Sequence, residues 1–201
     1  FLKIDKIKSA KTLINYLAIN HGQQISFNSL SQVVGLDDKT AKNYVEILKE
    51  TFLIKINTPW YTNKNKEIVK IPKIYFIDNG VRNYFINNFN DTNLRDDTSF
   101  LLESFVISEL LKMGFSDNII KFWRTNNKQE VDLILECGTK IKAVEIKYKK
   151  SVKKSDLRGL KNFIAKYPQY TPVFLINLNN NKSPDAKIIF LSPFEIESLR
   201  C

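Results

Sequence analysis

Two acids and one lysine lie on neighbouring apolar segments of this sequence, at a spacing that could assemble a site for phosphate chemistry. "EVDLILE" contains Asp132, and "KAVEIKY" contains Glu145 and Lys147. Both segments alternate with the two-residue period of strands, which predicts an antiparallel hairpin. A turn centred between Gly138 and Thr139 gathers the apolar residues on one face and sets Asp132 opposite Glu145, with side chains about 5 Å apart. A register shifted by one residue would mix polar and apolar residues on both faces.

Facing carboxylates destabilise a hairpin and raise the pKa of one of them, unless a positive charge lies between them. Magnesium binds one or two carboxylates together with waters and a substrate phosphate, so Mg²⁺ or Mn²⁺ is the predicted cofactor, with Asp132 and Glu145 as ligands. Lys147 projects from the same face, roughly 7 Å from Glu145. It could orient or help deprotonate an attacking water and offset negative charge in the transition state. The alternative is a solvated strand face on which Lys147 pairs with Glu130, worth under about 1 kcal/mol.

The elements that precede this hairpin begin with a helical region over residues 8 to 56. A first amphipathic helix is expected to end at Gly22. Gly35 separates two further helices, the first capped by Asn28 or Ser29 and the second by Asp38. A strand, "FLIKI", follows, and "NTPWYTNKNKEIVKI" can return beside it as a β-wing.

This arrangement resembles the winged-helix family in "SLSQVVGLDDKTAKNYVEILKETFLI". The resemblance implies that the helix over residues 38–49 could lie in a DNA major groove. Its exposed N-terminal part would offer Lys39, Thr40, Lys42 and Asn43. Winged helices also serve as rigid spacers or protein-docking modules, and Asp37, Asp38 and Glu46 on the same face weaken attraction to phosphate.

From residue 74 the pattern changes to a short strand, a turn at residues 79–80 and a short helix. A helix capped by Asp97 or Thr98 and ended by Gly114 comes next, followed by three strands, a helix and a further strand. The last segment, "KIIFLSPFEIESL", could add one more strand and a short closing helix. This order predicts an α/β sandwich whose antiparallel meander is joined by a crossover to a parallel strand. We therefore predict a mixed α/β fold, with a winged-helix domain at residues 1–72 and a sandwich with a mixed central sheet at residues 73–201.

"VD" at residues 131–132 and "EIK" at residues 145–147 resemble the PD-(D/E)XK nuclease superfamily, which has the restriction-endonuclease-like fold. The resemblance implies that Asp132 and Glu145 hold the metal, that the carbonyl of Ile146 can add a ligand, and that Lys147 acts on the nucleophile. Glu103 in "LLESFVISELL" matches the additional helix acid of that superfamily. The sequence departs from the family in having Val131 in place of proline and in lacking an evident Gln-x-x-x-Tyr element.

A wider resemblance covers most of the chain and points to the C-terminal region of a prokaryotic AAA-type ATPase family. It implies that the ATPase module, and any ATP binding, lie before Phe1, and no G-x-x-x-x-G-K-[ST] loop occurs in these residues. The predicted function is metal-dependent DNA phosphodiester hydrolysis. The first alternative is an inactive nuclease fold that binds nucleic acid or a partner protein and regulates the ATPase. The second is a structural domain that assembles the ATPase into a homo-oligomer.

The formal net charge of +10 favours a polyanionic partner, although lysine-rich composition alone can produce it. Arg124, Thr125 and Gln129 flank the predicted site and could contact phosphate. A basic edge suited to tracking a nucleic-acid backbone is formed by Lys147, Lys149, Lys150, Lys153 and Lys154, although the same residues could form a solvated loop and helix start. The aromatic residues near these loops could stack on bases, but packing in the core is the commoner role; they are Trp60, Tyr61 and Trp123.

Neither a run of eighteen apolar residues nor a signal-like leader occurs in the sequence, so a cytoplasmic location away from membranes is expected. The two cysteines, Cys137 and Cys201, form neither a disulfide framework nor a metal-binding pattern, and both are expected to be incidental. The lone His21 is expected to be structural.

Overall fold

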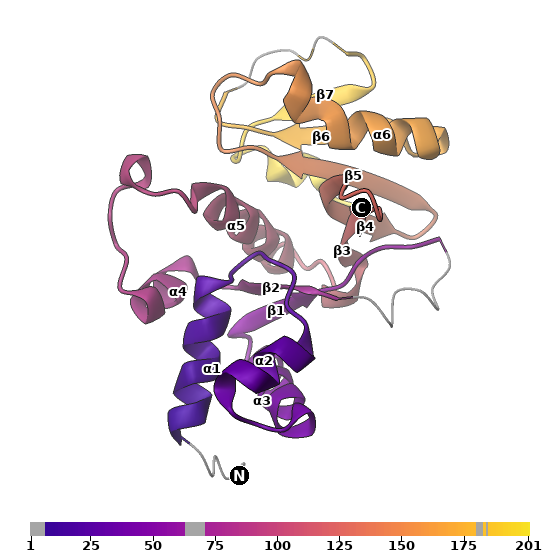
Figure 1. The fold of residues 1–201 in the computed structure, drawn as a ribbon. Coiled ribbons are helices and arrows are strands. Elements are labelled where there is room, and N and C mark those ends of the chain that lie inside the picture. Colours follow the sequence, from indigo (N-terminus) through magenta and orange to yellow (C-terminus); the bar gives the residue numbers. More distant parts are fainter. Residues whose placement is uncertain (1–6, 63–70, 180–182, 184) are drawn as a thin grey trace. The chain divides into compact units, whose positions relative to one another are not determined.

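The computed structural model describes residues 7–62, 71–179, 183 and 185–201 of the chain (Figure 1). The chain forms two compact units. The N-terminal unit consists of residues 1–57 and 71–95, and the C-terminal unit consists of residues 58–70 and 96–201. These units differ from the predicted division at residue 72, because the strand that begins at residue 73 and the helix after it belong to the N-terminal unit.

Three helices and a two-stranded sheet form the main part of the N-terminal unit. Its elements are α1 (Ile7–Ile19), α2 (Phe27–Val34), α3 (Asp38–Glu50), β1 (Ile54–Asn57), β2 (Lys73–Phe76) and α4 (Asn79–Ile86). Buried residues of α1, α2, α3 and the sheet, including Leu17, Leu30 and Val45, share one apolar core. His21 is buried beside this core, where its Nδ1 accepts a hydrogen bond from the Phe76 N–H.

The predicted helix-turn-helix is present, but its caps lie earlier than expected. Ser26, rather than Asn28 or Ser29, caps α2 by accepting the Ser29 N–H, and Asp37, rather than Asp38, caps α3 by accepting the Thr40 N–H. Both caps have the extended backbone conformation that an N-cap requires. Gly35 ends α2 with a φ of 64°, a left-handed conformation that glycine adopts without strain.

β1 pairs antiparallel with β2, which begins at Lys73 and therefore lies after the stretch of residues 57–71 that was predicted to return beside β1 as the wing. Residues 63–70 of the predicted wing lie outside the described residues. The segment just before them joins the C-terminal unit instead. The Trp60 N–H donates to the Phe122 carbonyl at 2.6 Å, and the Phe122 N–H donates to the Thr58 carbonyl at 3.2 Å.

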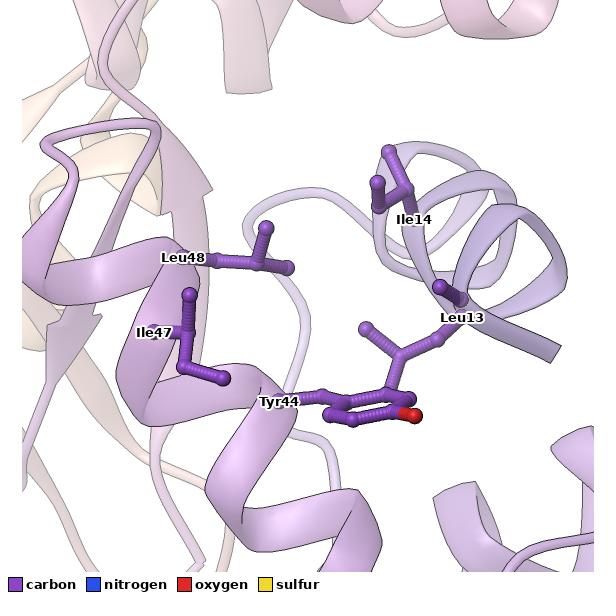
Figure 2. Close-up of a pocket in the computed structure, with 6 residues that line it drawn as sticks. Leu13, Ile14, Tyr44, Ile47 and Leu48 are labelled. Atoms are coloured by element: carbon purple, nitrogen blue, oxygen red, sulfur yellow. The ribbon is translucent and has the colours of Figure 1, made fainter. Parts of the chain in front are cut away.

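A small cavity of about 60 Å³ lies between α1 and α3 of the N-terminal unit. Figure 2 shows Leu13 and Ile14 on α1 facing Tyr44, Ile47 and Leu48 on α3. Its apolar lining offers no charged group, and its volume is well below the roughly 300 Å³ at which ligand pockets begin. We interpret it as a packing gap where the two helices meet.

The C-terminal unit is a five-stranded mixed sheet with helices packed on it. Its elements are α5 (Thr98–Lys112), β3 (Ile120–Arg124), β4 (Glu130–Cys137), β5 (Lys140–Ile146), α6 (Arg158–Lys166), β6 (Val173–Ile176) and β7 (Ile188–Leu191). The strand order is β3-β4-β5-β6-β7. β3, β4 and β5 pair antiparallel, while β5, β6 and β7 pair parallel. The predicted mixed α/β fold, with a crossover helix between β5 and β6, is confirmed.

α6 covers one face of this sheet and α5 lies on the other side (Figure 1). Leu160 and Phe163 of α6 are fully buried and pack with Ala143 of β5 and Leu175 of β6 in one core. Side chains alternate across a strand, so the residues of β5 on the Ala143 side face α6. The next such residue toward the end of the strand is Glu145, which places the predicted acid beneath the helix.

The predicted register of the β4–β5 hairpin is also confirmed. Leu133 pairs with Val144 and Ile134 with Ala143, and the pairing continues in the same register to Cys137 and Lys140. The position after Leu133–Val144 is the one occupied by Asp132 and Glu145. Hydrophobic alternation therefore selected the correct register.

The expectation for the cysteines is wrong. Cys137, at the end of β4, and Cys201 form a disulfide that closes a segment of 64 residues. The pairing could not be recognised from sequence spacing, because folding brings two distant residues together. Lys142 fixes the same end of the chain by donating from Nζ to the Arg200 carbonyl at 2.5 Å. Of the helices in the described ranges, none has the length and apolar character needed to cross a membrane.

Candidate functional site

The end of the β4–β5 hairpin gathers two carboxylates and one ammonium group. Asp132 Oδ2 accepts the Ile146 N–H at 2.8 Å, which fixes the carboxylate against β5. Lys147 Nζ lies 3.8 Å from Asp132 Oδ2 and is hydrogen-bonded to Glu145 Oε1. The structure thus brings together the three residues that the sequence predicted. We call Asp132, Glu145, Lys147 and the nearby Glu103 the carboxylate–lysine cluster.

The alternative pairing of Lys147 with Glu130 does not occur. Glu130 Oε2 instead lies 2.6 Å from Nη1 of Arg124 on the neighbouring strand. Because Lys147 turns toward Asp132 and Glu145, its charge is directed into the cluster rather than across the hairpin. A solvated strand face does not account for this arrangement.

The cluster is buried more deeply than charged groups usually are. Asp132 retains 7% of its exposure, Glu145 retains 5%, and Glu103 on α5 retains 6%. Burial raises the pKa of Glu145 well above its ordinary value, and the charges of Asp132 and Glu103 raise it further. Lys147 opposes this shift through its charge and its hydrogen bond, but the upward shift prevails. The repulsion predicted for the facing acids is therefore present.

The pKa of Lys147 is also raised, but by the neighbouring carboxylates rather than by burial. Desolvation alone would lower its pKa, but the carboxylates of Asp132, Glu145 and Glu103 together raise the pKa above its ordinary value. The ammonium group therefore stays protonated at neutral pH. A protonated lysine can stabilise negative charge on a phosphate, but it cannot accept a proton.

Glu145 Oε2 is fully buried, and no described residue forms a hydrogen bond with it. This oxygen faces Gly159 in the first turn of α6. A Cβ added to Gly159 would lie 3.2 Å from Glu145 Oε2 and only 2.1 Å from the carbonyl oxygen of Glu130. The missing side chain lets α6 approach both strands closely and leaves the carboxylate oxygen beneath the helix without a partner. A buried oxygen without a partner is costly unless a proton or a cation satisfies it.

The donor set fits a hard divalent cation such as Mg²⁺ or Mn²⁺. Such ions take carboxylate oxygens and complete their coordination with waters and a substrate phosphate. Among the described residues, no three or more His, Cys, Asp or Glu side chains are already arranged to hold a metal. A cation at Asp132 and Glu145 would therefore need ligands from outside the chain, and Lys147 would have to release Glu145 Oε1.

The predicted phosphate contacts of the C-terminal unit divide into engaged and exposed side chains. The Arg124 side chain is bound to Glu130, and the Thr125 side chain accepts the backbone N–H of Gln129 through Oγ1 at 3.2 Å. Lys149 Nζ lies 2.7 Å from Asp156 Oδ1. Three further members of the predicted basic edge are exposed; they are Lys150, Lys153 and Lys154. Among the described residues, none forms an ion pair with these three lysines. A phosphate backbone could therefore bind them without displacing a carboxylate.

On α3, Lys39, Lys42 and Asn43 are exposed as predicted. Thr40 is half-buried and engaged with the cap, since its Oγ1 donates to Asp37 Oδ2 at 2.7 Å. Lys42 Nζ lies 5.8 Å from the centre of the Phe27 ring. The helix thus offers fewer unengaged groups than the sequence suggested.

Trp60 and Trp123 each retain 3% exposure and belong to the core beneath α6, so neither ring is available for stacking on a base. Trp60 also donates from Nε1 to Glu136 Oε1 at 2.9 Å. The sequence reasoning missed Gly159, whose lack of a side chain shapes the cluster. A single glycine inside the amphipathic helical segment "LRGLKNF" was the available signal, because a glycine within a helix costs about 1 kcal/mol relative to alanine.

The fold and site define a chain with a helix-turn-helix unit followed by a mixed-sheet α/β unit that buries a carboxylate–lysine cluster. Two family models match separate parts of the chain. Residues 98–196 match the family model of a domain of unknown function (DUF4143), and residues 1–92 match that of another domain of unknown function (DUF8612).

Proteins with similar sequences are described only as uncharacterised. Rv2008c of Mycobacterium tuberculosis and Mb2031c of Mycobacterium bovis are each 29% identical over 133 residues, which is 65% of this chain and 30% of theirs. A Haemophilus influenzae protein is 29% identical over 144 residues, 69% of this chain and 34% of its own length. The chain therefore spans about a third of the length of these curated relatives.

A crystal structure of protein VC1899 from Vibrio cholerae covers 96% of this chain and 49% of its own, at 14% sequence identity and a TM-score of 0.36. A similarity at this level adds nothing to the interpretation of the site.

Proposed function

We propose that the C-terminal unit is a metal-dependent phosphodiesterase that acts on nucleic acid, with DNA as the expected substrate. The observation that carries this proposal is the buried pair Asp132 and Glu145, in which Glu145 Oε2 has no described hydrogen-bond partner and Lys147 contacts both carboxylates. A purely structural face would not need to bury like charges together at the end of a hairpin.

In this proposal Asp132 and Glu145 hold Mg²⁺ or Mn²⁺, and Glu103 adds negative charge from α5. The cation, when bound, would lower the pKa of a coordinated water and draw electron density from the phosphate. The hydrogen bond from the Ile146 N–H keeps the Asp132 carboxylate oriented toward the cluster. The raised pKa of Lys147 keeps it cationic, so its part is to stabilise the charge that develops on the phosphate.

The second candidate is a nuclease-like fold that binds nucleic acid or a partner protein without cleaving. The arrangement of Lys147 favours it, because an ammonium group already compensates part of the charge of both carboxylates. The described residues also contain no ready-made group of three metal ligands among His, Cys, Asp and Glu. The response to metal separates the two candidates.

The decisive experiment is a melting titration with Mn²⁺, followed by cleavage of labelled DNA with Mg²⁺ or Mn²⁺. Binding at about 100 times the dissociation constant should stabilise the parent by about 2.7 kcal/mol. Asp132→Asn should abolish this shift, whereas Asp156→Asn removes an acid outside the cluster and should keep it. If Asp132→Asn responds to Mn²⁺ as the parent does, the metal site is not at this cluster and the proposed catalysis fails.

We further propose that the chain works beside an ATPase module in a longer protein, where any ATP would bind. The support is the length of its curated relatives, of which the matched region is about a third. Nucleic acid and that module are the partners this function requires, and a homo-oligomer is the third possibility. A cytoplasmic location, where nucleic acid and ATP are available, belongs to the same proposal.

A further inference from the structure

A cavity of about 360 Å³ opens on the C-terminal unit beside the carboxylate–lysine cluster, and the proposed catalysis does not use it. The side chains around it come from β3, the β3–β4 turn, the end of α6 and the segment near Tyr61. They are Tyr61, Trp123, Arg124, Thr125, Asn126, Asn127, Lys166 and Tyr167. The volume lies in the range of pockets that bind small organic ligands, which begins at about 300 Å³.

The lining combines aromatic rings, cations and carboxamides. Lys166 Nζ lies 5.4 Å from the centre of the Tyr167 ring and 6.0 Å from that of Trp123. None of the described residues that line the cavity is acidic. Arg124 uses Nη1 for Glu130, but a guanidinium carries five N–H donors, so further donors can serve a ligand. A ligand that fits this lining has a flat ring and a negative charge.

The Tyr167 ring forms part of the aromatic side of the cavity, and its neighbours hold it in place before any ligand binds. Tyr167 is only half-buried, so part of its ring surface remains accessible. The ring packs edge-on against Trp60 at 5.2 Å between centres and lies 5.0 Å from Phe163. A ring fixed in this way can stack on a base with little loss of conformational entropy.

The β3–β4 turn forms the polar side of the cavity, and two backbone hydrogen bonds hold its conformation. The Thr125 N–H donates to the Gln129 carbonyl at 2.9 Å, and the Lys128 N–H donates to the Thr125 carbonyl at 3.0 Å. Asn126 and Asn127 are therefore presented at the tip of a fixed turn, and both are exposed. A carboxamide offers a donor and an acceptor together, which suits the hydrogen-bonding edge of a nucleobase.

The cavity and the cluster are connected through β4 and α6. Arg124 is bonded to Glu130, which lies two residues, or about 7 Å, from Asp132 along the same strand. The Glu130 carbonyl and Glu145 Oε2 both face Gly159 in the first turn of α6, and Lys166 and Tyr167 follow at the end of that helix. Seven residues, or about 10 Å of helix, separate Gly159 from Lys166, so a strand of a few nucleotides could reach from the cavity to the cluster.

We propose that this cavity binds an unpaired nucleobase, so that the nucleic acid presented to the carboxylate–lysine cluster is single-stranded or locally unpaired; the second half of this statement rests on the proposed function. A base inside a duplex cannot enter such a cavity, because both of its faces are stacked on neighbours and its pairing edge is occupied.

The test measures binding without metal, in EDTA, with three labelled probes of equal length. The probes are an oligothymidylate, a DNA duplex and an abasic deoxyribose-phosphate strand that carries the charge without bases. The parent should bind the oligothymidylate at least about fivefold more tightly than the abasic strand, the lower limit for stacking of one base. Equal affinity for these two strands would overturn the proposal, because charge alone would then explain binding.

Variants locate the binding site. Asn126→Ala combined with Asn127→Ala should weaken oligothymidylate binding severalfold and leave abasic-strand binding much less affected. Lys166→Ala removes a positive charge and should weaken binding of both strands. Lys161→Ala removes an exposed lysine from the same helix outside the cavity and should change neither. Tyr167→Ala should lose the preference for bases, and Tyr167→Phe should keep it, which separates stacking from a folding defect. Parental affinity in all the cavity variants would overturn the proposal.

The two proposals can fail separately. If the parent neither binds Mn²⁺ nor cleaves DNA, but the cavity variants still lose binding to the oligothymidylate, the cavity is confirmed and the catalytic function is not. If the parent cleaves single strands and duplexes equally well and the cavity variants cleave as the parent does, the cavity proposal is overturned while the catalytic function stands.

Discussion

The two units place their charged residues in contrasting ways. On α3 of the N-terminal unit the charges are exposed, and several serve the helix itself, as Asp37 does by capping it and Lys49 by pairing with Glu46 at 3.4 Å. In the C-terminal unit the charges of Asp132 and Glu145 are buried together beneath α6. An exposed charge costs little and needs no further explanation, whereas a buried group of like charges does.

This contrast shows that the number of basic residues in a segment does not indicate where charges are buried. α3 has the lysines expected of a recognition helix, yet acids and local contacts occupy part of that face. The carboxylate–lysine cluster has a single lysine, but three acids raise the pKa of that lysine and fix its charge. The experiments that follow test whether function resides in the cluster or on the exposed helix.

The largest effect is expected for Lys147→Ala in the cleavage reaction. Removing one preorganised charge that stabilises a transition state lowers the rate by about 100- to 1,000-fold. Initial rates with Mn²⁺ would be compared with those of Lys140→Ala, which removes a lysine from the other end of β5. Equal rates for the parent and Lys147→Ala would assign any cleavage to a contaminant.

Loss of the disulfide should have the next largest effect, and it should be confined to the C-terminal unit. A cross-link that closes 64 residues stabilises a protein by about 4 kcal/mol in the chain-entropy treatment, and measured values are commonly about 2–4 kcal/mol. Cys201→Ser should therefore speed hydrogen exchange in β4 and β5. The parent treated with a reductant should behave in the same way, and faster exchange in α3 instead would contradict this assignment.

Gly159→Ala tests the close approach of α6 to the strands. In an unconstrained helix this change should stabilise by about 1 kcal/mol, because alanine favours helices over glycine. Here the added Cβ would meet the Glu130 carbonyl at 2.1 Å, so we expect destabilisation of about 1–3 kcal/mol. Urea unfolding gives the sign directly, with Lys161→Ala as the control on the same helix.

A smaller effect is expected from Lys39→Ala combined with Lys42→Ala on α3. Each lysine that contacts a phosphate contributes about one unit to the salt dependence of DNA binding. Because Lys42 lies over the Phe27 ring, we expect the slope to fall by about one unit rather than two. Lys11→Ala on α1 is the matched control. An unchanged slope would exclude α3 from the DNA interface.

The smallest effect is expected for Asp156→Asn, in the dependence of the free energy of unfolding on pH. Burial would raise the pKa of Asp156, but hydrogen bonds from Lys149 and from the Lys153 N–H hold it below its ordinary value of 3.8. A carboxyl with a lowered pKa stabilises the folded state above 3.8, and this contribution is lost as pH falls through the folded pKa. Asp156→Asn should thus be less stable than the parent at pH 7, by under about 1 kcal/mol, because the partner Lys149 is half-exposed and solvent screens the pair. The difference should disappear in acid, as followed by urea unfolding at several pH values.

The sequence by itself determined the local elements and the register that brings Asp132 opposite Glu145. Alternation of apolar residues needs neighbours only two positions apart, and burial of one face leaves a single register for the β4–β5 hairpin. The helix-turn-helix followed from the same local rules, apart from caps that lie one to three residues earlier than predicted.

Only the tertiary structure decided which distant groups complete the site. Gly159 lets α6 close over Glu145 Oε2, and Cys137 meets Cys201 across 64 residues. The cavity beside the cluster likewise joins the segment near Tyr61, the β3–β4 turn and the end of α6. Such contacts depend on how helices pack on the sheet, which is set by the shape of the whole core and leaves no periodic signal along the chain.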